Sequence, residues 1–373
     1  MDLVNNYFHQ EIIMRFKNNV LAAFAIVAGS VVLSQSAWAF KVGIAMPTQN
    51  EERWMKDGIN LKKAFEEKGY QTELFYGGDA DVPIQQRQIP RLVDEGCDVL
   101  VIGAIDGSAL TEALKSAKKK NIPVISYDRL LMDSDAVSYY ATFDNVQAGQ
   151  LQAMSIVNAL NLNTDPSPKT IEFICGSLDD NNTKMFWTGA MDILKPYLDN
   201  GQLVCLSGNS TLEAVAIPGW STDTAMKMTE AFINKVGYGP GKKKLDAIYS
   251  MADCLSFGAV TALHNAGYSG DNFPFISGQD ATAKAINLIK KGEMGMTVFK
   301  DTGKLAERVV KMVDSIANGK TVEINDDFSY DNGTGKIKTY LEEPVMVDKD
   351  NYQKVVLDSG YITREALEDP ANQ

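Results

Sequence analysis

Two series of short apolar runs alternate with amphipathic segments along the chain from residue 40 onwards. The runs are rich in β-branched and aromatic residues, which is typical of strands that are buried on both faces. In the first series they predict strands over 40–46, 71–76, 98–104 and 122–128. In the second series they predict strands over 170–176, 202–208, 245–251, 273–280 and 296–300.

The segments between these strands have the periodicity of helices. Within 107–120, apolar side chains recur at spacings of three and four at Leu110, Ala113, Leu114 and Ala117, which places them on one helix face. Further helices are predicted near 54–68, 84–95, 145–160, 182–198, 222–235, 254–266, 281–291 and 302–318. Strands that alternate with helices form a parallel sheet covered on both faces, so the two series predict an α/β fold of two doubly wound lobes.

The N-terminal segment does not follow this alternation. Two basic residues precede an apolar run over 20–33, and the small-residue sequence Ala-Trp-Ala ends at residue 39. This order is typical of a secretory signal cleaved before Phe40, and the apolar run is shorter than the ~20 residues of a membrane anchor. The stretch before Met14 is unlike the start of such a signal, so we expect translation to start at Met14. The mature protein is then expected to be exported to the periplasm.

The composition disfavours several classes of function. The 373 residues carry a net charge of −12, which argues against a nucleic-acid groove lined by Lys and Arg. Of two histidines, only His264 lies beyond the expected cleavage site. Catalytic triads, Cys-His dyads and poly-His metal sites are therefore disfavoured, and we expect neither a metal nor a cofactor.

Four cysteines remain after the expected cleavage, and an exported protein can form disulfides. Each of them lies in or beside an apolar run, where a small buried thiol fits. No C-x-x-C motif is present. The sequence therefore favours buried thiols over bridges at Cys97, Cys175, Cys205 and Cys254.

Polar and aromatic residues gather at the carboxyl ends of the predicted strands, where open α/β sheets bind ligands. A sugar hydroxyl both donates and accepts hydrogen bonds, so it fits between a carboxylate and a guanidinium, amide or ammonium group. Indole rings can cover the C–H faces of the sugar ring. A polyhydroxylated ligand is therefore predicted at Arg53, Trp54, Asp128, Arg129, Asp180, Asn182, Trp220, Asp253, Asp280 and Lys300.

Each of these residues also has a simpler structural explanation. Asp128 and Arg129 fit a helix-capping acid beside a solvated base, and residues 179–182 fit the N-cap of the following helix. Trp220 could fill a surface between the lobes, and Lys300 could end an exposed strand. The functional hypothesis depends on the recurrence of such residues at the same topological position in both lobes.

The chain resembles the periplasmic sugar-binding proteins of bacterial ABC uptake systems, above all their xylose-binding and multiple-sugar-binding members. The resemblance covers about 40 to 368 and is carried by the ordered motifs KVGIAMPT…ERW, VLVIGAIDG, VISYDRL, YYATFDN, LDDNN, FISGQDA and MTVFKDT. It implies a type I periplasmic binding protein fold, in which two Rossmann-like lobes joined by a hinge close on one aldopyranose. It also implies that the predicted site residues other than Asp253 contact the sugar.

The same resemblance implies how the chain is divided and what it binds. The N-terminal lobe would comprise 40–143 and 301–340, and the C-terminal lobe 144–300 and 341–373. The protein would be a monomer that delivers a monosaccharide to an ABC membrane permease. A chemoreceptor or sensor kinase would be a further partner, and nucleic acid would not.

The sequence departs from the family after the predicted strand 245–251. The xylose- and ribose-binding relatives have Asn-Asp there, whereas this chain has Ala252 and Asp253. An amide that would bind one hydroxyl is therefore missing. Either Asp253 replaces it or the pocket accepts a different sugar, and the sequence leaves xylose, glucose, galactose and similar neutral aldoses open.

Two alternatives come from other functional classes. A secreted glycosidase would use paired carboxylates such as Asp180 and Asp280. Arg129 and Lys300 should keep nearby carboxylates ionised, so we expect no acid with a raised pKa and no enzyme activity. A sugar-responsive regulator of the LacI type shares such lobes, but it needs a basic helix-turn-helix where this chain has its predicted signal.

Overall fold

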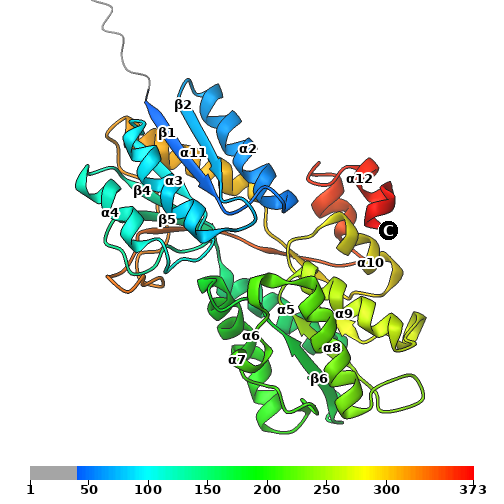
Figure 1. The fold of residues 1–373 in the computed structure, drawn as a ribbon. Coiled ribbons are helices and arrows are strands. Elements are labelled where there is room, and N and C mark those ends of the chain that lie inside the picture. The colour runs from blue at the N-terminus through cyan, green and yellow to red at the C-terminus, as the bar shows by residue number, and fades with distance from the viewer. Residues whose placement is uncertain (1–39) are drawn as a thin grey trace, which may run out of the picture. The chain divides into compact units, whose positions relative to one another are not determined.

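The structure is a computed structural model that describes residues 40–373, and the signal segment predicted over 1–39 lies outside the described residues. Its first part is a six-stranded parallel sheet in the order β11-β5-β4-β3-β1-β2 (Figure 1). The strands are β1 (Lys41–Met46), β2 (Gln71–Tyr76), β3 (Val99–Ile102), β4 (Val124–Tyr127), β5 (Val137–Phe143) and β11 (Thr339–Glu342). The edge strand β11 thus joins this sheet from far along the chain.

Helices cover both faces of the six-stranded sheet. They are α2 (Glu52–Glu67), α3 (Val82–Asp94), α4 (Thr111–Lys119) and α11 (Thr302–Ala317). Successive strand residues point to opposite faces. Val101 therefore packs with Leu61 of α2 and Leu305 of α11, whereas Leu100 packs on the other face with Leu92 of α3.

A second, four-stranded parallel sheet has the order β7-β6-β8-β9, and a two-stranded antiparallel ribbon lies in the same buried core. The strands are β6 (Lys169–Ile174), β7 (Leu203–Val204), β8 (Ala247–Ser250) and β9 (Phe275–Ile276), with β10 (Thr297–Phe299) and β12 (Val345–Val347) in the ribbon. The helices of this part are α5 (Asn145–Ala159), α6 (Asn181–Asp199), α7 (Leu212–Val215), α8 (Thr222–Val236), α9 (Asp253–Asn265), α10 (Ala283–Lys291) and α12 (Arg364–Glu368). Short 3-10 turns lie at Pro218–Trp220, Gly270–Asn272 and Pro370–Asn372, and a π-helical turn at Gln353–Leu357.

Helices α5 and α6 pack with their backbones in close contact. A Cβ atom added at Gly189 would lie 1.9 Å from the carbonyl oxygen of Val146, and one added at Gly149 would lie 2.0 Å from that of Phe186. Only glycine permits this approach. The contact holds α6 close against α5, and the site described below uses the N-terminal end of α6.

The predicted α/β fold with parallel sheets is confirmed, with differences at several strands. The strands predicted over 202–208 and 273–280 shorten to β7 and β9, and the one predicted over 296–300 pairs antiparallel with β12. Beyond β7 the chain leaves the sheet because the N–H of Ser207 donates to the buried carboxylate of Glu172, at 3.0 Å, instead of to a strand. Strands β5, β11 and β12 were not predicted as strands.

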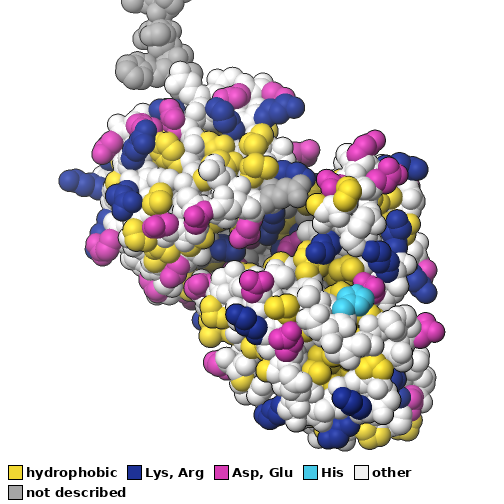
Figure 2. Space-filling model, turned by 45° about the vertical axis from the view of Figure 1, so that its right-hand side comes forward, with side chains coloured by type: hydrophobic (Ala, Val, Ile, Leu, Met, Phe, Trp, Pro, Cys, Tyr) yellow, Lys and Arg dark blue, Asp and Glu magenta, His cyan; other side chains and the backbone are white. Residues whose placement is uncertain are grey.

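The four cysteines are free thiols, as the sequence favours. Cys97 and Cys175 are buried, but Cys205 and Cys254 are only partly so. Lys and Arg are interspersed with Asp and Glu over the face seen in Figure 2, rather than gathered in one basic patch. Within 40–373, no helix combines the length and apolar character needed to cross a membrane.

Candidate ligand-binding site

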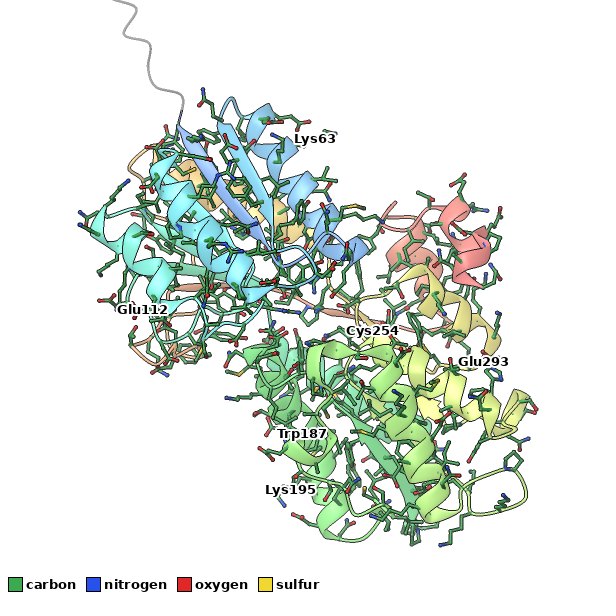
Figure 3. The ribbon with its side chains drawn as sticks, viewed as in Figure 1. Lys63, Glu112, Trp187, Lys195, Cys254 and Glu293 are labelled. Carbon is green, nitrogen blue, oxygen red and sulfur yellow. The ribbon has the colours of Figure 1, made fainter. Side chains whose placement is uncertain are left out.

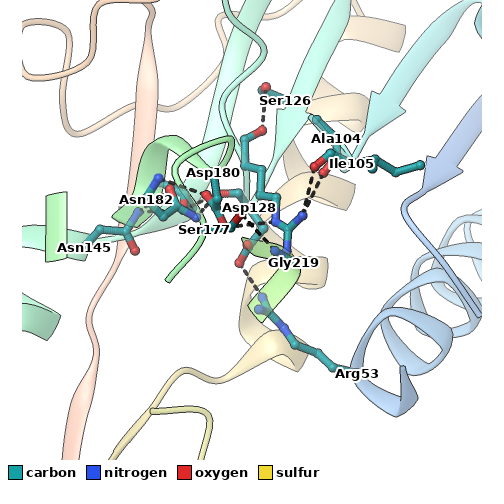
Figure 4. Close-up of polar contacts among 12 residues, drawn as sticks. Arg53, Ala104, Ile105, Ser126, Asp128, Asn145, Ser177, Asp180, Asn182 and Gly219 are labelled. Atoms are coloured by element: carbon teal, nitrogen blue, oxygen red, sulfur yellow. Dashed lines mark hydrogen bonds and ion pairs between the residues drawn. The ribbon is translucent and has the colours of Figure 1, made fainter. Parts of the chain in front are cut away.

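All of the predicted site residues line one cavity of about 270 Å³. The side chains come from the loops or from the beginnings of the helices that follow β1, β4, β6, β8, β9 and β10, and from the turn before α8. The carboxyl ends of strands in both sheets therefore contribute to a single site. This is where ligands are expected to bind in open α/β sheets. Figure 4 shows the polar contacts around Asp128, Arg53 and Asp180.

Three residues of the cavity have a left-handed backbone that side-chain-bearing residues rarely adopt. The φ angles are +61° at Asp128, +56° at Trp220 and +105° at Asp280. Such conformations cost about 1–3 kcal/mol each and persist where the surroundings impose them. Their concentration at this cavity indicates a functional site.

Arg53, in the first turn of α2, connects acids from both sheets. Its Nη2 donates to Oδ2 of Asp128, and its Nη1 lies 4.0 Å from Oδ1 of Asp280. Burial acts to lower the pKa of Arg53, but the carboxylates of Asp128 and Asp280 outweigh it and raise that pKa above its ordinary value. Burial acts to raise the pKa of Asp128, but Arg53 and Lys300 outweigh it and hold that pKa below its ordinary value. Both groups are therefore charged at neutral pH.

Lys300, which follows β10, is a buried base rather than an exposed strand end. Its side chain is only 4% exposed, and its Nζ lies 3.1 Å from Oδ1 of Asp280. The ammonium also lies over the rings of Phe143 and Phe186, 5.7 and 5.5 Å from their centroids. The structural explanation of Lys300 as a solvated residue is therefore wrong.

Arg129 forms the third acid–base pair of the cavity. Its Nε lies 3.1 Å from Oδ2 of Asp180, and its Nη1 donates to the carbonyl oxygens of Ala104 and Ile105, at 3.3 and 3.2 Å. No helix begins at Asp128, so the capping explanation is wrong for Asp128 and Arg129. Asp180, in contrast, is the N-cap of α6 and accepts from the N–H of Asn182 at 2.9 Å. It therefore caps a helix and lines the cavity at once.

Asp253 lines the cavity, but its carboxylate already has protein partners. One oxygen accepts from the N–H and Oγ1 of Thr282, at 2.9 and 3.0 Å, and the other accepts from Oγ1 of Thr297 at 2.8 Å. Burial, with the nearby charge of Asp280, raises the pKa of Asp253 to about 7. Burial also raises the pKa of Asp180 despite Arg129. The expectation that the site holds no acid with a raised pKa is therefore wrong.

The two tryptophans of the cavity have different surroundings. Trp54 is 2% exposed, and the guanidinium groups of Arg53 and Arg129 lie 4.7 and 5.1 Å from its ring centroid. The Trp220 ring packs against Gly176, where an added Cβ would lie 2.1 Å from it. Trp187 lies on α6 (Figure 3), where it is half-buried and packs against the core, its ring 5.6 Å from that of Phe173. Trp54 and Trp220 are therefore the indoles at the cavity.

Two residues that line the cavity each carry a buried polar atom without a hydrogen-bond partner. Among the described residues, Nε1 of Trp220 and Oε1 of Gln279 are buried and form no hydrogen bond. One is a donor and the other an acceptor. Across residues 40–373, no cluster of His, Cys, Asp and Glu has the arrangement of a metal site.

Several cavity residues were not predicted from the sequence. Phe186 lies one helical turn after Asn182, and Phe257 one turn after Asp253, so the i, i+4 spacing could have identified both. Glu51, Cys254 and Thr282 are sequence neighbours of predicted residues and also line the cavity. Ala252, where the xylose- and ribose-binding relatives have an amide, lines it as well.

Comparisons with known proteins agree on one family. The family described as "periplasmic binding protein domain" matches residues 42–321. The multiple sugar-binding periplasmic receptor ChvE of Rhizobium radiobacter is 42% identical over 352 residues, which is 94% of this chain and 98% of that protein. The D-xylose-binding periplasmic protein of Escherichia coli is 32% identical over 322 residues, or 86% of this chain and 90% of that protein.

A solved structure gives the same result at the level of the fold. It is that of an ABC transporter solute binding protein from Clostridium phytofermentans with bound β-D-glucose. It superimposes with a TM-score of 0.84 at 45% sequence identity, and the match covers 88% of this chain and 99% of that one. The fold and the sequence therefore point to the same relatives.

Proposed function

The chain belongs to the periplasmic binding protein family, and from this we propose that it captures a neutral aldose monosaccharide and delivers it to an ABC sugar permease. The relatives that support the proposal are named as sugar-binding and xylose-binding receptors, and the solved relative binds β-D-glucose. The proposed location is the periplasm, where those relatives act. A chemoreceptor or sensor kinase is proposed as a further partner, because both would bind the closed form.

The observation that carries the proposal is the charge pairing inside the cavity. Arg53 pairs with Asp128, Arg129 with Asp180 and Lys300 with Asp280. Because each base already faces an acid, a charged ligand would leave one group without compensation in a buried site. A neutral ligand with many hydroxyls can instead bind several of these charged groups at once. We propose the predicted site residues as its contacts, with Asp253 and Asn182 limited by the bonds they already make to protein.

We propose that binding closes two lobes about a hinge, with the lobe boundaries stated above except that the third lies after Glu342, because all of β11 pairs with β5. Two observations support this. Helix α11 packs on the first sheet and β11 is one of its strands, whereas β12 pairs with β10 in the core of the second part. The chain therefore passes between the two parts near residues 143, 300 and 342. A ligand that contacts both parts stabilises only the arrangement in which they are together.

A glycosidase is the enzyme that this site resembles most, because the raised pKa of Asp253 would suit a general acid. Both oxygens of Asp253 are occupied by Thr282 and Thr297, however, so a proton there is not directed at a glycosidic oxygen. We therefore propose binding without catalysis. Incubation with aryl glycosides should release no phenol, and steady release would contradict the proposal.

A thermal-shift panel of pentoses and hexoses tests the proposed function. A sugar at a hundred times its dissociation constant should stabilise the folded protein by about 2.7 kcal/mol, because only the folded state binds it. The matched controls are the corresponding sugar acids and amino sugars, which carry a charge and should give smaller shifts. If no neutral aldose raises the melting temperature, the proposal is wrong.

A further inference from the structure

The backbone carbonyl of Asp128 accepts hydrogen bonds from three side chains. The hydroxyl of Tyr140 donates at 2.6 Å, Oγ1 of Thr142 at 2.9 Å and Nδ2 of Asn182 at 3.0 Å. Tyr140 and Thr142 lie on β5, beside β4 in the six-stranded sheet, whereas Asn182 lies at the start of α6, after β6 of the other sheet. This carbonyl therefore joins the two parts of the molecule without any ligand atom.

The carbonyl of Asp128 is held in place by a strained turn. The N–H of Arg129 donates to the carbonyl of Tyr127 at 2.6 Å, and Asp128 between them has a φ of +61°. This is a γ-turn of the rare, strained form. The side chain of Asp128 lines the cavity, and its carbonyl accepts from Asn182 (Figure 4). The same carbonyl accepts from the hydroxyl of Tyr140.

The amide of Asn182 is oriented by its own part of the molecule. Its Oδ1 accepts from Nδ2 of Asn145 at 2.9 Å, and Asn145 begins α5, which packs against α6. The hydroxyl of Tyr140 also lies 3.0 Å from this Oδ1. A flipped amide would place its oxygen against the carbonyl of Asp128, so the contacts permit one orientation. The NH₂ group thus faces Asp128.

Tyr140 belongs to this cluster but not to the ligand cavity. It is fully buried, and the residues that line the cavity do not include it. Its hydroxyl has one hydrogen, shared between the carbonyl of Asp128 and Oδ1 of Asn182. Any effect of removing that hydroxyl on ligand affinity must therefore act through these protein groups.

We propose that Tyr140 and Asn182, with the carbonyl of Asp128, form a latch that favours the closed arrangement whichever sugar is bound. The inference rests on the proposed function. Tyr140 is then a positioning residue, and its hydroxyl contributes to affinity through the fraction of protein that is closed. The apparent affinity is proportional to the fraction of protein in the closed, binding-competent arrangement. Loss of the Tyr140 hydroxyl therefore lowers the affinity for every sugar by the same factor.

The test compares Tyr140→Phe with Arg129→Lys across the sugars that bind the wild-type protein. Losing one net hydrogen bond predicts that Tyr140→Phe weakens each affinity about three- to tenfold, by a common factor. Its dissociation rates should rise while association rates stay within about twofold. Arg129→Lys changes a proposed sugar contact and should alter the ranking of the sugars. Tyr139→Phe, on the same strand, is the matched control and should leave all affinities unchanged.

Two outcomes would overturn the latch. Unchanged affinities in Tyr140→Phe would mean that the cluster is a fixed pivot that opening does not break. A loss that differs from sugar to sugar would mean that Tyr140 shapes the cavity itself. Failure of the proposed function is distinct, because the wild-type protein would then bind none of the sugars. If Tyr140→Phe folds poorly, Asn145→Ala, which frees the Asn182 amide to rotate, should raise the dissociation rate of every sugar, although by unequal factors because Asn182 also lines the cavity.

Discussion

Asp253 is the predicted site residue whose surroundings differ most from the expected role. The sequence left Asp253 as a replacement for the amide that is missing at Ala252, but its oxygens accept from Thr282 at the start of α10 and from Thr297 on β10. The side chain is 1% exposed. Its main effect in this structure is to join two segments of the cavity wall.

The buried carboxyl of Asp253 should make stability depend on pH. Burial raises its pKa from an ordinary 3.8 to about 7, so the folded state binds a proton more tightly than the unfolded state. That contribution to stability is fully present below about pH 4 and is lost as pH rises to about 7. Asp57 acts in the same direction, because burial raises its pKa to about 6.

Asp253→Asn should remove most of this dependence. An amide can accept from Thr282 and donate to Thr297, so the fold should persist. Relative to wild type, the variant should gain about 1.4 kcal/mol for each pH unit between about 4 and 7. Urea unfolding of both proteins at pH 4.5, 6 and 8 measures the difference. A difference that is constant across this range would show that Asp253 titrates normally.

Arg129→Lys tests a cavity residue that contacts one acid and two backbone carbonyls. Lysine cannot pair with Asp180 and donate to the carbonyls of Ala104 and Ile105 at the same time. Those carbonyls lose their donor, and the positive charge of the side chain takes a different position in the cavity. We expect a tenfold to hundredfold loss of sugar affinity. An exposed ion pair would tolerate the exchange within ~1 kcal/mol. Titration calorimetry with the best sugar decides, and wild-type affinity would place Arg129 outside the site.

At the scale of elements, helices were predicted better than strands. The helix predicted over 302–318 is α11 (Thr302–Ala317), because many turns repeat the same apolar spacing. Strands β11 and β12 are short, and their pairing partners are distant in sequence, so no local pattern identifies them. The candidate site was predictable because it depends on where strands end. The hydrogen-bond partners of Asp253 and Asn182 were not, since they come from other elements.

The close contact of α5 and α6 gives a prediction at this scale. In Gly189→Ala the new methyl group would overlap the carbonyl of Val146, and the helices must separate. The cost of overpacking, about 1–3 kcal/mol, should exceed the gain in helix propensity. Because the first turn of α6 carries Asn182, sugar affinity should fall as well.

Thermal unfolding and calorimetry of Gly189→Ala check both effects. Thr188→Ala, an exposed neighbour on the same helix, is the control and should change stability by less than ~0.5 kcal/mol. Stability equal to wild type in Gly189→Ala would show that the helices can separate without cost.

At the scale of the whole molecule, the proposed closure has a direct measurement. The two sheets have separate buried cores, so they can move as units if the connecting segments bend. Small-angle scattering should show the radius of gyration of the protein from Phe40 onwards falling when a binding sugar is added. A non-binding sugar at the same concentration is the control. An unchanged radius with proven binding would mean that no hinge motion accompanies capture.

The γ-turn at Asp128 assigns two tasks to different atoms of one residue. Its side chain lines the cavity, whereas its carbonyl accepts from Tyr140 and Asn182. The backbone carbonyl group is the same whichever side chain a residue carries. During evolution the side chains around the cavity could therefore diversify toward new sugars while the energetics of closing stayed constant. Receptors that diverged from such a protein would keep the same free energy of closing and would change only their selectivity for sugars.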